Sequence, residues 1–391
     1  MYESLTGTIS GMPVSASRVL VIAIMANLLV LACLALKGWR LRGRLDRIPV
    51  RIHVAGTRGK STTARLIAAG FRASGRTVVG KTTGSEPRVL LPDGTERRIA
   101  RLGCPSIREQ ADLMSLAARR GADAVVAECM AIQPEMLWAS EALFVRATTL
   151  VVTNARADHL EEFGDDPAAI ADALRWLVPD AGDVVAARDV ATDAFRRHVT
   201  ARRSRLTLVD TSGLDPTEAN RALALAVCAL HGLDRDAAAR QMSGAAPDPG
   251  HFTEVRLTIH GKPVRFANAF ACNDVESFAR FWDRRPDVTR PVVVLNARSD
   301  RPLRTRDFLR FLARQNPLPL LFVAGDALGC VLARRAGFDA GSIRRLRSRG
   351  GHALRDIAEA TPSGGTIWGI GNYHGFGAQL TAALAKAGGS C

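Results

Sequence analysis

The chain has 391 residues, which is enough for two or three domains with full hydrophobic cores. Hydrophobic residues make up 47% and charged residues 23%, a composition typical of a globular protein. The formal net charge of +15 indicates an anionic partner: nucleic acid, anionic lipid or a polyanionic substrate. Aromatic residues are only 5% and follow no stacking pattern, so nucleic acid is the weaker candidate and we expect none as a partner. The seven cysteines include no Cys-x-x-Cys pair, so the sequence indicates neither a zinc site nor a disulfide framework.

An apolar run near the N-terminus, Val19 to Leu36, contains Asn27 as its only strongly polar residue. As a helix this run would be about 27 Å long, close to the thickness of the hydrocarbon layer. Lysine and arginine residues follow it, which places the N-terminus outside and the main body in the cytoplasm. We therefore predict an extracytoplasmic segment over 1–17 and a single-pass anchor in the inner (cytoplasmic) membrane over 18–40. A cleaved signal peptide and a buried core helix are the alternatives, although no A-x-A cleavage site follows the run.

The next part, 41–245, alternates apolar runs of β type with helical patterns, which predicts a doubly wound parallel sheet. The segment 82–105 is polar and rich in Gly and Pro, and we expect it to be a long loop that covers the nucleotide or the substrate. The expected strands are 50–55, 77–80, 123–127, 148–153, 183–187 and 206–210. The expected helices are 60–73, 106–119, 134–142, 167–177, 191–202 and 216–231.

A turn-rich joint at 245–250 is the expected boundary to a smaller Rossmann-like α/β domain over 246–391. We expect this second domain to close over the nucleotide and substrate. Its expected strands are 254–259, 263–268, 291–296, 319–324 and 366–370. Its expected helices are 274–283, 305–314, 327–336, 351–359 and 375–387.

The strand at 50–55 leads into a glycine turn and then a helix, in the order RIHVAGTRGKSTT from Arg51 to Thr63. Such a turn points backbone N–H groups at one spot beside the positive end of the helix dipole. Lys60 would add a cation for the β- and γ-phosphate oxygens, and the Ser61 hydroxyl is placed to ligate Mg²⁺. The full P-loop pattern has a further glycine where Val54 stands, so this is a shortened version, and a chance match in a surface turn is the alternative. We predict a nucleotide-phosphate site made by Gly56, Thr57, Arg58, Gly59, Lys60, Ser61 and Thr62.

Ligands of an open parallel sheet bind outside the carboxyl ends of its strands, so the residues that end each strand are candidates for the site. Glu128 closes an apolar strand as a Walker-B carboxylate does, and we expect it to bind Mg²⁺ directly or through water; a paired surface acid is the alternative. His159 beside Asp158 is a candidate second-metal ligand, although imidazole suits Mg²⁺ or Mn²⁺ only moderately and a structural role is the alternative. In chain order the strand ends deliver Lys81, Thr82 and Thr83, then Glu128, then Asn154, Asp158 and His159.

Several sequence blocks together resemble a known family. They are HVAGTRGKST, VGKTTGSEPR, AVVAECMA, VTNARADH, APDPG, NAFACND, VLNARSDR and GIGNYHG, in this order along the chain. Together they resemble the ATP-dependent ligase subunit of poly-γ-glutamate synthases, the CapB or PgsB type, which is a relative of Mur ligases and folylpolyglutamate synthases. The resemblance covers essentially the whole chain. It implies a Mur-ligase-like central domain that binds ATP and Mg²⁺, with Mn²⁺ as an alternative metal.

The resemblance also implies roles for individual positions. Asn220, in EANRALALA, matches the asparagine that contacts adenine in Mur ligases; an ordinary residue of the first helical turn is the alternative. His374 belongs to a family signature, with packing inside a turn as the alternative. The implied catalytic residues are Lys60, Glu128, His159, Arg298 and Arg301. The implied metal ligands are Ser61, Glu128 and His159. The candidate substrate residues are Lys81, Thr82, Thr83, Asn273, Asp274 and His374.

Two departures from the Mur pattern change what we expect of the site. Mur ligases carry a carbamylated lysine on the helix after the Asp–His pair, whereas the expected helix 167–177 contains no lysine, so a carbamate bridge between metals is not expected. Many Mur ligases also have Pro-Gly-Arg at the domain joint, where this chain has Pro249, Gly250 and His251. The arginine that faces the phosphates would then be replaced by His251 or supplied by Arg298 or Arg301.

The expected function is ATP-dependent polymerisation of glutamate into poly-γ-glutamate through an acyl phosphate, for a capsule or secreted polymer. The expected partners are glutamate, the growing chain and other membrane subunits of a synthase and export complex, with homo-oligomer formation left open. The alternative within the same class is a folate or muropeptide γ-glutamyl ligase. The alternative from another class is a membrane-anchored P-loop ATPase or kinase that regulates export of a surface polymer.

Overall fold

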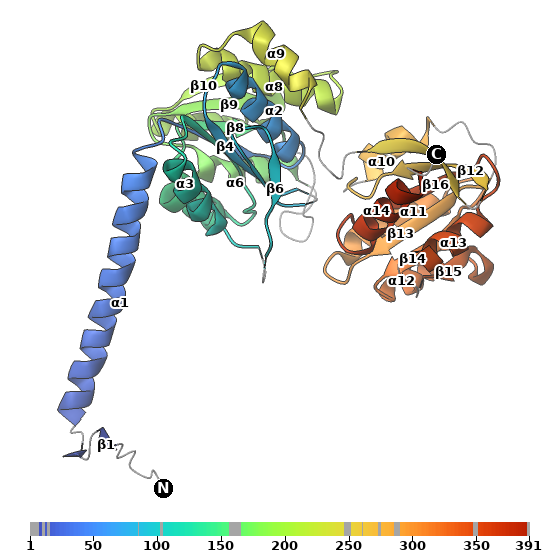
Figure 1. Ribbon diagram of the computed structural model, residues 1–391, viewed down its shortest axis with the longest axis horizontal. Helices are drawn as coiled ribbons and strands as arrows, with labels where there is room; N and C mark the ends of the chain where they lie inside the picture. The colour runs from blue at the N-terminus through green and yellow to red at the C-terminus, as the bar shows by residue number, and fades with distance from the viewer. Residues whose placement is uncertain are drawn as a thin grey trace.

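The computed structural model describes residues 8–9, 12–13, 16–84, 86–101, 105–155, 166–245, 252–259, 261–272, 275–284, 290–346 and 351–388. Two short strands, β1 (Thr8–Ile9) and β2 (Met12–Pro13), pair antiparallel ahead of the first helix. That helix, α1 (Ala16–Leu45), projects from the domain that follows it (Figure 1). Its segment Arg18–Leu45 is long and apolar enough to cross a membrane, and the most apolar 18 residues of this segment are not buried at all.

The last turn of α1 belongs to the core of the domain that follows. Leu45 and Ile48 are buried against helix α3 (Glu109–Arg119), in a cluster with Met114. Arg44 Nη1 donates a 2.6 Å hydrogen bond to Ser115 Oγ on the same helix. The helix therefore runs past the expected end of the anchor at residue 40 and joins the domain without an intervening loop.

The first domain contains an eight-stranded sheet in the order β10-β9-β8-β3-β7-β4-β5-β6. Its strands from β10 to β4 are parallel to their neighbours, while β5 and β6 pair antiparallel at one edge. The strands are β3 (Val50–Ala55), β4 (Val78–Thr82), β5 (Arg88–Leu90), β6 (Glu96–Arg98), β7 (Ala124–Glu128), β8 (Thr149–Val152), β9 (Asp183–Ala187) and β10 (Arg205–Val209).

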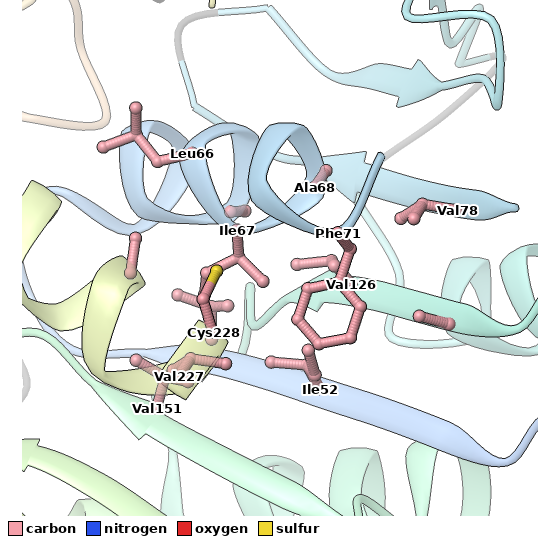
Figure 2. Packing of buried hydrophobic residues seen from close by; sticks show 14 of the residues in the cluster. Ile52, Leu66, Ile67, Ala68, Phe71, Val78, Val126, Val151, Val227 and Cys228 are labelled. Atoms are coloured by element: carbon pink, nitrogen blue, oxygen red, sulfur yellow. The ribbon is translucent and has the colours of Figure 1, made fainter. Parts of the chain in front are cut away.

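Helices cover both faces of this sheet, because alternate residues of each buried strand are apolar on both sides. On one face Ile67, Phe71 and Val227 pack on Ile52 and neighbouring strand residues (Figure 2). Burying a side chain of this size stabilises the fold by about 1.5–3 kcal/mol. The helices of the two faces are α2 (Lys60–Ala73), α8 (Pro216–Leu230) and α9 (Arg235–Ser243) on one side, and α3, α4 (Pro134–Ala139), α6 (Pro167–Leu174) and α7 (Asp193–Ala201) on the other.

The predicted doubly wound parallel sheet is confirmed, with corrections in its details. The segment 82–105 is not one long loop, because it contains the β5–β6 hairpin. Strand β4 continues to Thr82, two residues beyond the expected end. Helix α9 was not expected, and the expected helix 134–142 changes to a π-helical segment at Ser140–Val145. Short 3₁₀ turns occupy Arg175–Leu177, Arg188–Val190 and Ala340–Ser342.

The second domain contains a six-stranded sheet in the order β11-β12-β16-β13-β14-β15. Only β11 pairs antiparallel, and the β15 strand was not expected from the sequence. The strands are β11 (Thr253–Ile259), β12 (Lys262–Asn268), β13 (Val292–Ala297), β14 (Leu320–Gly325), β15 (Ile343–Arg345) and β16 (Thr366–Ile370). The helices are α10 (Val275–Trp282), α11 (Pro302–Ala313) and α12 (Leu328–Ala336) over one face, and α13 (Gly351–Ala360) and α14 (Phe376–Gly388) over the other.

Candidate active site

The glycine turn between β3 and α2 has a backbone that few other residues could adopt. Gly56 has φ of 118° and Gly59 has φ of 78°, both in the region that disfavours side chains. A Cβ at Gly56 would lie 2.2 Å from Thr153 Oγ1 and 2.9 Å from the Asn154 carbonyl oxygen. The turn therefore lies directly against the end of β8, and the first N–H groups of α2 are left at the mouth of the loop.

Two side chains at the end of β8 fix the shape of this phosphate loop. Asn154 Oδ1 accepts hydrogen bonds from Thr57 Oγ1 at 2.6 Å and from the Arg58 backbone N–H at 3.1 Å. Asn154 Nδ2 donates to the Arg58 carbonyl at 3.1 Å, and Thr153 Oγ1 donates to the same carbonyl at 2.5 Å. The sequence indicated Asn154 only as a strand-end residue. In the structure its side chain fixes the shape of the loop.

The Lys60 ammonium lies over the loop that it follows. Its Nζ donates hydrogen bonds to the carbonyl oxygens of Gly56 at 2.8 Å and Thr57 at 3.1 Å. These carbonyl contacts place a cation beside the N-terminus of α2, where the helix dipole also favours anions. The loop thus concentrates positive charge from two independent sources at one position.

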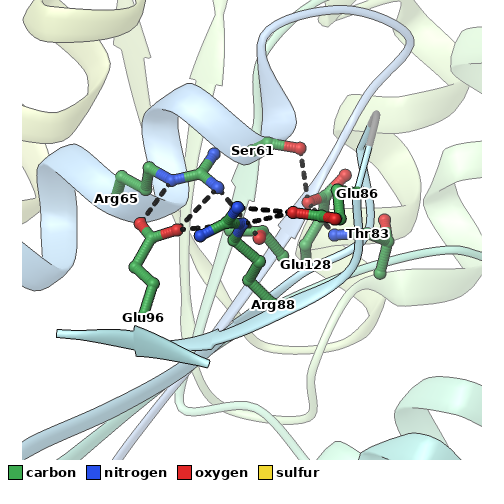
Figure 3. A network of polar contacts seen from close by, with 8 residues as sticks. Ser61, Arg65, Thr83, Glu86, Arg88, Glu96 and Glu128 are labelled. Atoms are coloured by element: carbon green, nitrogen blue, oxygen red, sulfur yellow. Dashed lines mark hydrogen bonds and ion pairs between the residues drawn. The ribbon is translucent and has the colours of Figure 1, made fainter. Parts of the chain in front are cut away.

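Ser61 and Glu128 meet beside the loop, from α2 and the end of β7. Ser61 Oγ donates a 2.7 Å hydrogen bond to Glu128 Oε2, and the Thr83 backbone N–H donates to the same oxygen at 2.6 Å (Figure 3). Glu128 is 2% exposed. A hydroxyl and a carboxylate are the hard oxygen ligands that Mg²⁺ and Mn²⁺ prefer, so this pair fits a divalent metal.

The β5–β6 hairpin is fastened to α2 by buried charges. Arg65, which is 4% exposed, donates from Nε to Glu96 Oε1 at 2.7 Å and from Nη2 to Thr82 Oγ1 at 3.3 Å. Arg88 contacts both Glu86 and Glu96, so the network runs along the hairpin toward Glu128 (Figure 3). The hairpin is therefore a fixed part of the wall beside the Ser61–Glu128 pair.

Lys81 is within β4 and lies deeper than the sequence suggested. It is 1% exposed and its Nζ forms a 2.8 Å ion pair with Glu109 Oε2 on α3. Burial lowers the pKa of Lys81, although Glu109 opposes this shift. Burial also opposes ionisation of Glu109, but hydrogen bonds from Arg101 and Lys81 outweigh it and lower the pKa of Glu109 to about 2. The Glu109 carboxylate is therefore ionised at neutral pH, which suits its pairing with Lys81.

Asn220 lies against the phosphate loop from the side of α8. This helix begins with a capping box between Asp215 and Glu218, which sets the position of its first turns. A Cβ built on Gly59 would approach Asn220 Oδ1 to 2.1 Å, and Asn220 is 8% exposed. The structure therefore places the Asn220 side chain next to Gly59.

Other candidates lie away from these contacts or outside the described residues. Asp158, His159, His251, Asn273 and Asp274 belong to segments that the structure does not describe. Thr62 is half-buried on the first turn of α2.

In the second domain, Arg298 Nε donates to Asp300 Oδ1 at 2.8 Å, which lowers the pKa of Asp300, and Arg301 directly precedes α11. His374 is exposed, and its carbonyl oxygen accepts a 2.8 Å hydrogen bond from Asn296 Nδ2. Asn296 and Asn372 exchange hydrogen bonds with each other's backbone carbonyls at 2.6 and 3.0 Å, so the ends of β13 and β16 are tied together. Neither asparagine was singled out from the sequence, although both stand at strand ends.

A buried polar group that the sequence did not indicate lies behind the site. His53, inside β3, is fully buried and its Nδ1 is 2.9 Å from Glu141 Oε2. Burial opposes protonation of His53, but Cys129 and Glu141 outweigh it and raise the pKa of His53 to about 9. The signal in the sequence was a histidine between two apolar residues, Ile52 and Val54, of a buried strand. Cys129 follows Glu128 directly, so the chain connects this group to the Ser61–Glu128 pair.

Comparison with known families divides the chain into two matched parts. Residues 54–222 match the Mur ligase middle domain, and residues 255–387 match the poly-gamma-glutamate synthase CapB C-terminal domain. PGA synthase CapB of Bacillus subtilis (strain 168) is 28% identical over 377 residues, which cover 90% of this chain and 96% of the relative. Capsule biosynthesis protein CapB of Bacillus anthracis is 29% identical over 355 residues, which cover 86% of this chain and 76% of the relative. The resemblance to CapB-type proteins is confirmed.

Solved structures support the same fold. E. coli FolC in complex with ADP aligns with a TM-score of 0.68 at 17% identity, covering 89% of this chain and 92% of that one. A bifunctional folylpolyglutamate synthase/dihydrofolate synthase with Mn, AMPPNP and L-glutamate bound aligns with a TM-score of 0.65 at 18% identity, covering 89% and 93%. The chain therefore has the Mur-ligase-like and FolC-like α/β fold over most of its length.

Proposed function

We propose that this CapB-like chain is an ATP-dependent amide ligase that joins glutamate residues into poly-γ-glutamate for a capsule or secreted polymer. The observation that carries the proposal is the contact between Ser61 and Glu128 beside the Lys60 loop. It occurs in a chain that aligns with CapB proteins over most of its length. Because the relatives are named as PGA synthase and capsule biosynthesis proteins, glutamate is the proposed substrate.

The phosphate loop is the proposed ATP site. The first N–H groups of α2, at 60–62, would bind phosphate oxygens, and Lys60 would exchange the carbonyls of Gly56 and Thr57 for the β- and γ-phosphates. Asn154 keeps the loop in the shape that this exchange needs. Asn220, beside Gly59, is the proposed contact to the nucleoside.

Ser61 and Glu128 are the proposed ligands of Mg²⁺, with Mn²⁺ as the alternative and His159 as a proposed further ligand. When bound, the metal supplies positive charge to the β- and γ-phosphate oxygens. A folylpolyglutamate synthase of the same fold binds Mn with AMPPNP, which supports a divalent metal with the nucleotide. Ser61 and Thr83 hold Glu128 Oε2 in place for this role. The helix after the Asp–His pair has no lysine, so we propose no carbamate bridge.

The proposed reaction has two steps. A carboxylate oxygen attacks the γ-phosphorus, a new O–P bond forms, the bond to the β-γ bridging oxygen breaks, and ADP leaves. The amine of the next glutamate then attacks the acyl carbon, the C–O bond to phosphate breaks, and the amide forms as the amine loses a proton. Lys60 would offset the charge that develops on the phosphoryl oxygens. Arg298 or Arg301 would do the same after the second domain closes and excludes water.

The glutamate substrates are proposed to bind near the ends of β4 and of the second-domain strands. Thr83 is fixed against Glu128 by its N–H, so a substrate group bound there would be close to the phosphoryl group. Lys81 and Thr82 would shape this wall from beneath, because both are buried. Asn273, Asp274 and His374 are the proposed substrate contacts from the second domain.

The apolar helix α1 indicates attachment to a membrane. We propose that it crosses the inner (cytoplasmic) membrane once, with the N-terminus outside and both α/β domains in the cytoplasm, because the cations follow the run. Synthesis would then occur beside other membrane subunits that export the polymer. We propose no nucleic-acid partner.

The test uses the full chain in detergent or nanodiscs, incubated with ATP, Mg²⁺ and labelled glutamate, with export subunits added one at a time. Lys60→Ala should abolish ADP release and polymer formation while the thermal midpoint stays unchanged. Arg240→Ala, which removes an exposed cation from α9, is the matched control and should retain both. Polymer formed by folded Lys60→Ala protein would overturn the proposal. ADP release that depends on a folate or muropeptide acceptor, which the likeness to FolC makes worth including, would replace it with the alternative ligase.

A further inference from the structure

Two arginines face each other across the edge of the second-domain sheet. Strand β11 pairs antiparallel with β12, and the register places Arg256 directly opposite Arg265. Side chains at such positions are close neighbours on one face, and like charges there are destabilising. Arg256 is exposed and Arg265 is half-buried. The two guanidinium groups therefore share one face at the sheet edge, where a bound anion would contact both.

A groove accompanies the arginine pair. Its volume is about 410 Å³, and it is lined by Arg256, Leu257, Thr258, Pro263, Val264, Arg265 and Gly364. Thr258 lies on the same side of β11 as Arg256, because alternate residues share one face of a strand. On this face the groove therefore combines two guanidinium groups and a hydroxyl with the ring of Pro263, which pairs with Thr258, whereas the side chains of Leu257 and Val264 are buried on the opposite face.

Acidic neighbours do not neutralise Arg256 within the described residues. Glu254 is exposed on the same strand two positions earlier, opposite Ala267. Among the residues that the structure describes, Arg256 forms no ion pair with Glu254 or any other carboxylate. Its guanidinium is therefore available to an external anion.

The edge position adds backbone groups to the same surface. Strand β11 is the last strand of its sheet, so it pairs through one side only. An edge strand leaves N–H and C=O groups along its other side, and an extended chain rich in amides can use them. The groove thus offers arginines for carboxylates and, beside them, backbone groups for amides.

We propose that this groove binds the γ-glutamyl chain as it grows, with Arg256 and Arg265 holding its carboxylates. The proposal deepens the proposed function by naming where the product is held apart from the phosphate loop. A γ-linked chain keeps one free carboxylate on every residue and an amide in every link. Guanidinium binds carboxylate through two parallel hydrogen bonds, which a lysine ammonium does not do. Holding the product would favour repeated additions to one chain over release after each addition.

The test measures binding directly, without ATP. The full chain is placed in nanodiscs of uncharged phosphatidylcholine, and a fluorescent γ-linked glutamate oligomer is titrated by anisotropy. Arg256→Gln with Arg265→Gln should weaken binding about tenfold or more, because two charge-assisted contacts are lost. The wild-type affinity should also fall as salt rises. In the synthesis assay the same variant should make shorter chains.

A charge-matched control separates the groove from general charge. Arg310→Gln with Arg334→Gln removes two exposed arginines from α11 and α12 of the same domain and should leave the oligomer affinity unchanged. If both double variants weaken binding equally, or neither does, the groove assignment is wrong. Vesicles containing phosphatidylglycerol form a second arm. Loss of vesicle binding with retained oligomer binding in the Arg256/Arg265 variant would show a lipid contact and overturn the proposal.

Failure of this proposal and failure of the proposed ligase activity give different results. Lys60→Ala protein should still bind the oligomer, because the phosphate loop is not part of the groove. If wild-type protein binds the oligomer but never makes polymer, the ligase proposal fails while the groove stands. If it makes polymer but the groove variant binds and elongates normally, only the groove proposal fails. Thermal midpoints of all variants exclude unfolding as the cause.

Discussion

Replacing Gly56 with alanine tests how tightly the phosphate loop is packed on the end of β8. Gly56 has φ of 118°, which L-residues rarely adopt. A Cβ there would lie 2.2 Å from Thr153 Oγ1 and 2.9 and 3.0 Å from the carbonyl oxygen and amide nitrogen of Asn154. The two contacts with Asn154 are to backbone, so rotation of a side chain does not relieve them.

The expected loss of stability has two parts. Holding an alanine at this backbone angle costs about 1–3 kcal/mol. Forcing its methyl group against the Asn154 backbone, just past the end of β8, costs about a further 1–3 kcal/mol. We therefore expect Gly56→Ala to lower the free energy of unfolding by about 2–6 kcal/mol. It should also remove ATP-dependent polymer formation, because the loop must move away from Asn154.

Gly75→Ala is the matched control. Gly75 follows α2 with φ of 75°, and nothing lies within 4 Å of the position that its Cβ would take. Gly75→Ala should lower the free energy of unfolding only through the strained backbone angle, by about 1–2 kcal/mol, and should keep the activity. Urea titrations of the full chain in detergent, followed by tryptophan fluorescence, would compare the two midpoints. Equal midpoints for Gly56→Ala and Gly75→Ala would refute the packing of the loop against β8.

Two further predictions concern buried charges. The pKa of His53 is raised to about 9, so its interactions with Cys129 and Glu141 should stabilise the fold fully below pH 6.5 and be lost as the pH rises toward 9. Urea midpoints measured from pH 6 to 10 should fall between pH 6.5 and 9 for the wild type and change less for Glu141→Gln. Parallel curves for the two proteins would contradict the interaction between His53 and Glu141. Arg65→Met should lower stability by about 3 kcal/mol, because the Glu96 carboxylate loses its buried partner. Proteolytic cleavage within 91–95 should also become faster. Arg97→Met changes an exposed residue of β6 and should alter neither the stability nor the cleavage rate. Equal stability and cleavage of the two variants would refute the role of Arg65 in holding the hairpin.

The sequence predicted those parts of the site that are local in the chain. The order of apolar strand, glycine turn and helix around Lys60 follows from backbone sterics and the spacing of apolar residues, so the loop between β3 and α2 was visible in one short stretch. The end of β7 at Glu128 was visible for the same reason. Its meeting with Ser61 followed from a general rule of parallel sheets, that strand ends gather at one edge.

The β5–β6 hairpin escaped prediction because its stability is not local. Strand β6 consists of Glu96, Arg97 and Arg98, a charged triplet with no strand pattern of its own, and it is held by Arg65 from a helix 31 residues earlier. Asn154 escaped as a loop-fixing residue for a related reason. Its partners Thr57 and Arg58 are 97 and 96 positions away, and only the adjacency of β8 and β3 brings them together.

By itself, the amino-acid sequence determined the alternation of strands and helices, the glycine turn and the apolar α1, since each depends on residues within a few turns of the chain. Only the tertiary structure decided which distant charges meet. Arg256 faces Arg265 because of one particular strand register, and a shift by one residue would send the side chains to opposite faces. His53 is paired because Glu141, in the π-helical segment Ser140–Val145, packs against β3. Such pairings arise from packing across the whole domain, and for that reason no local pattern contains them.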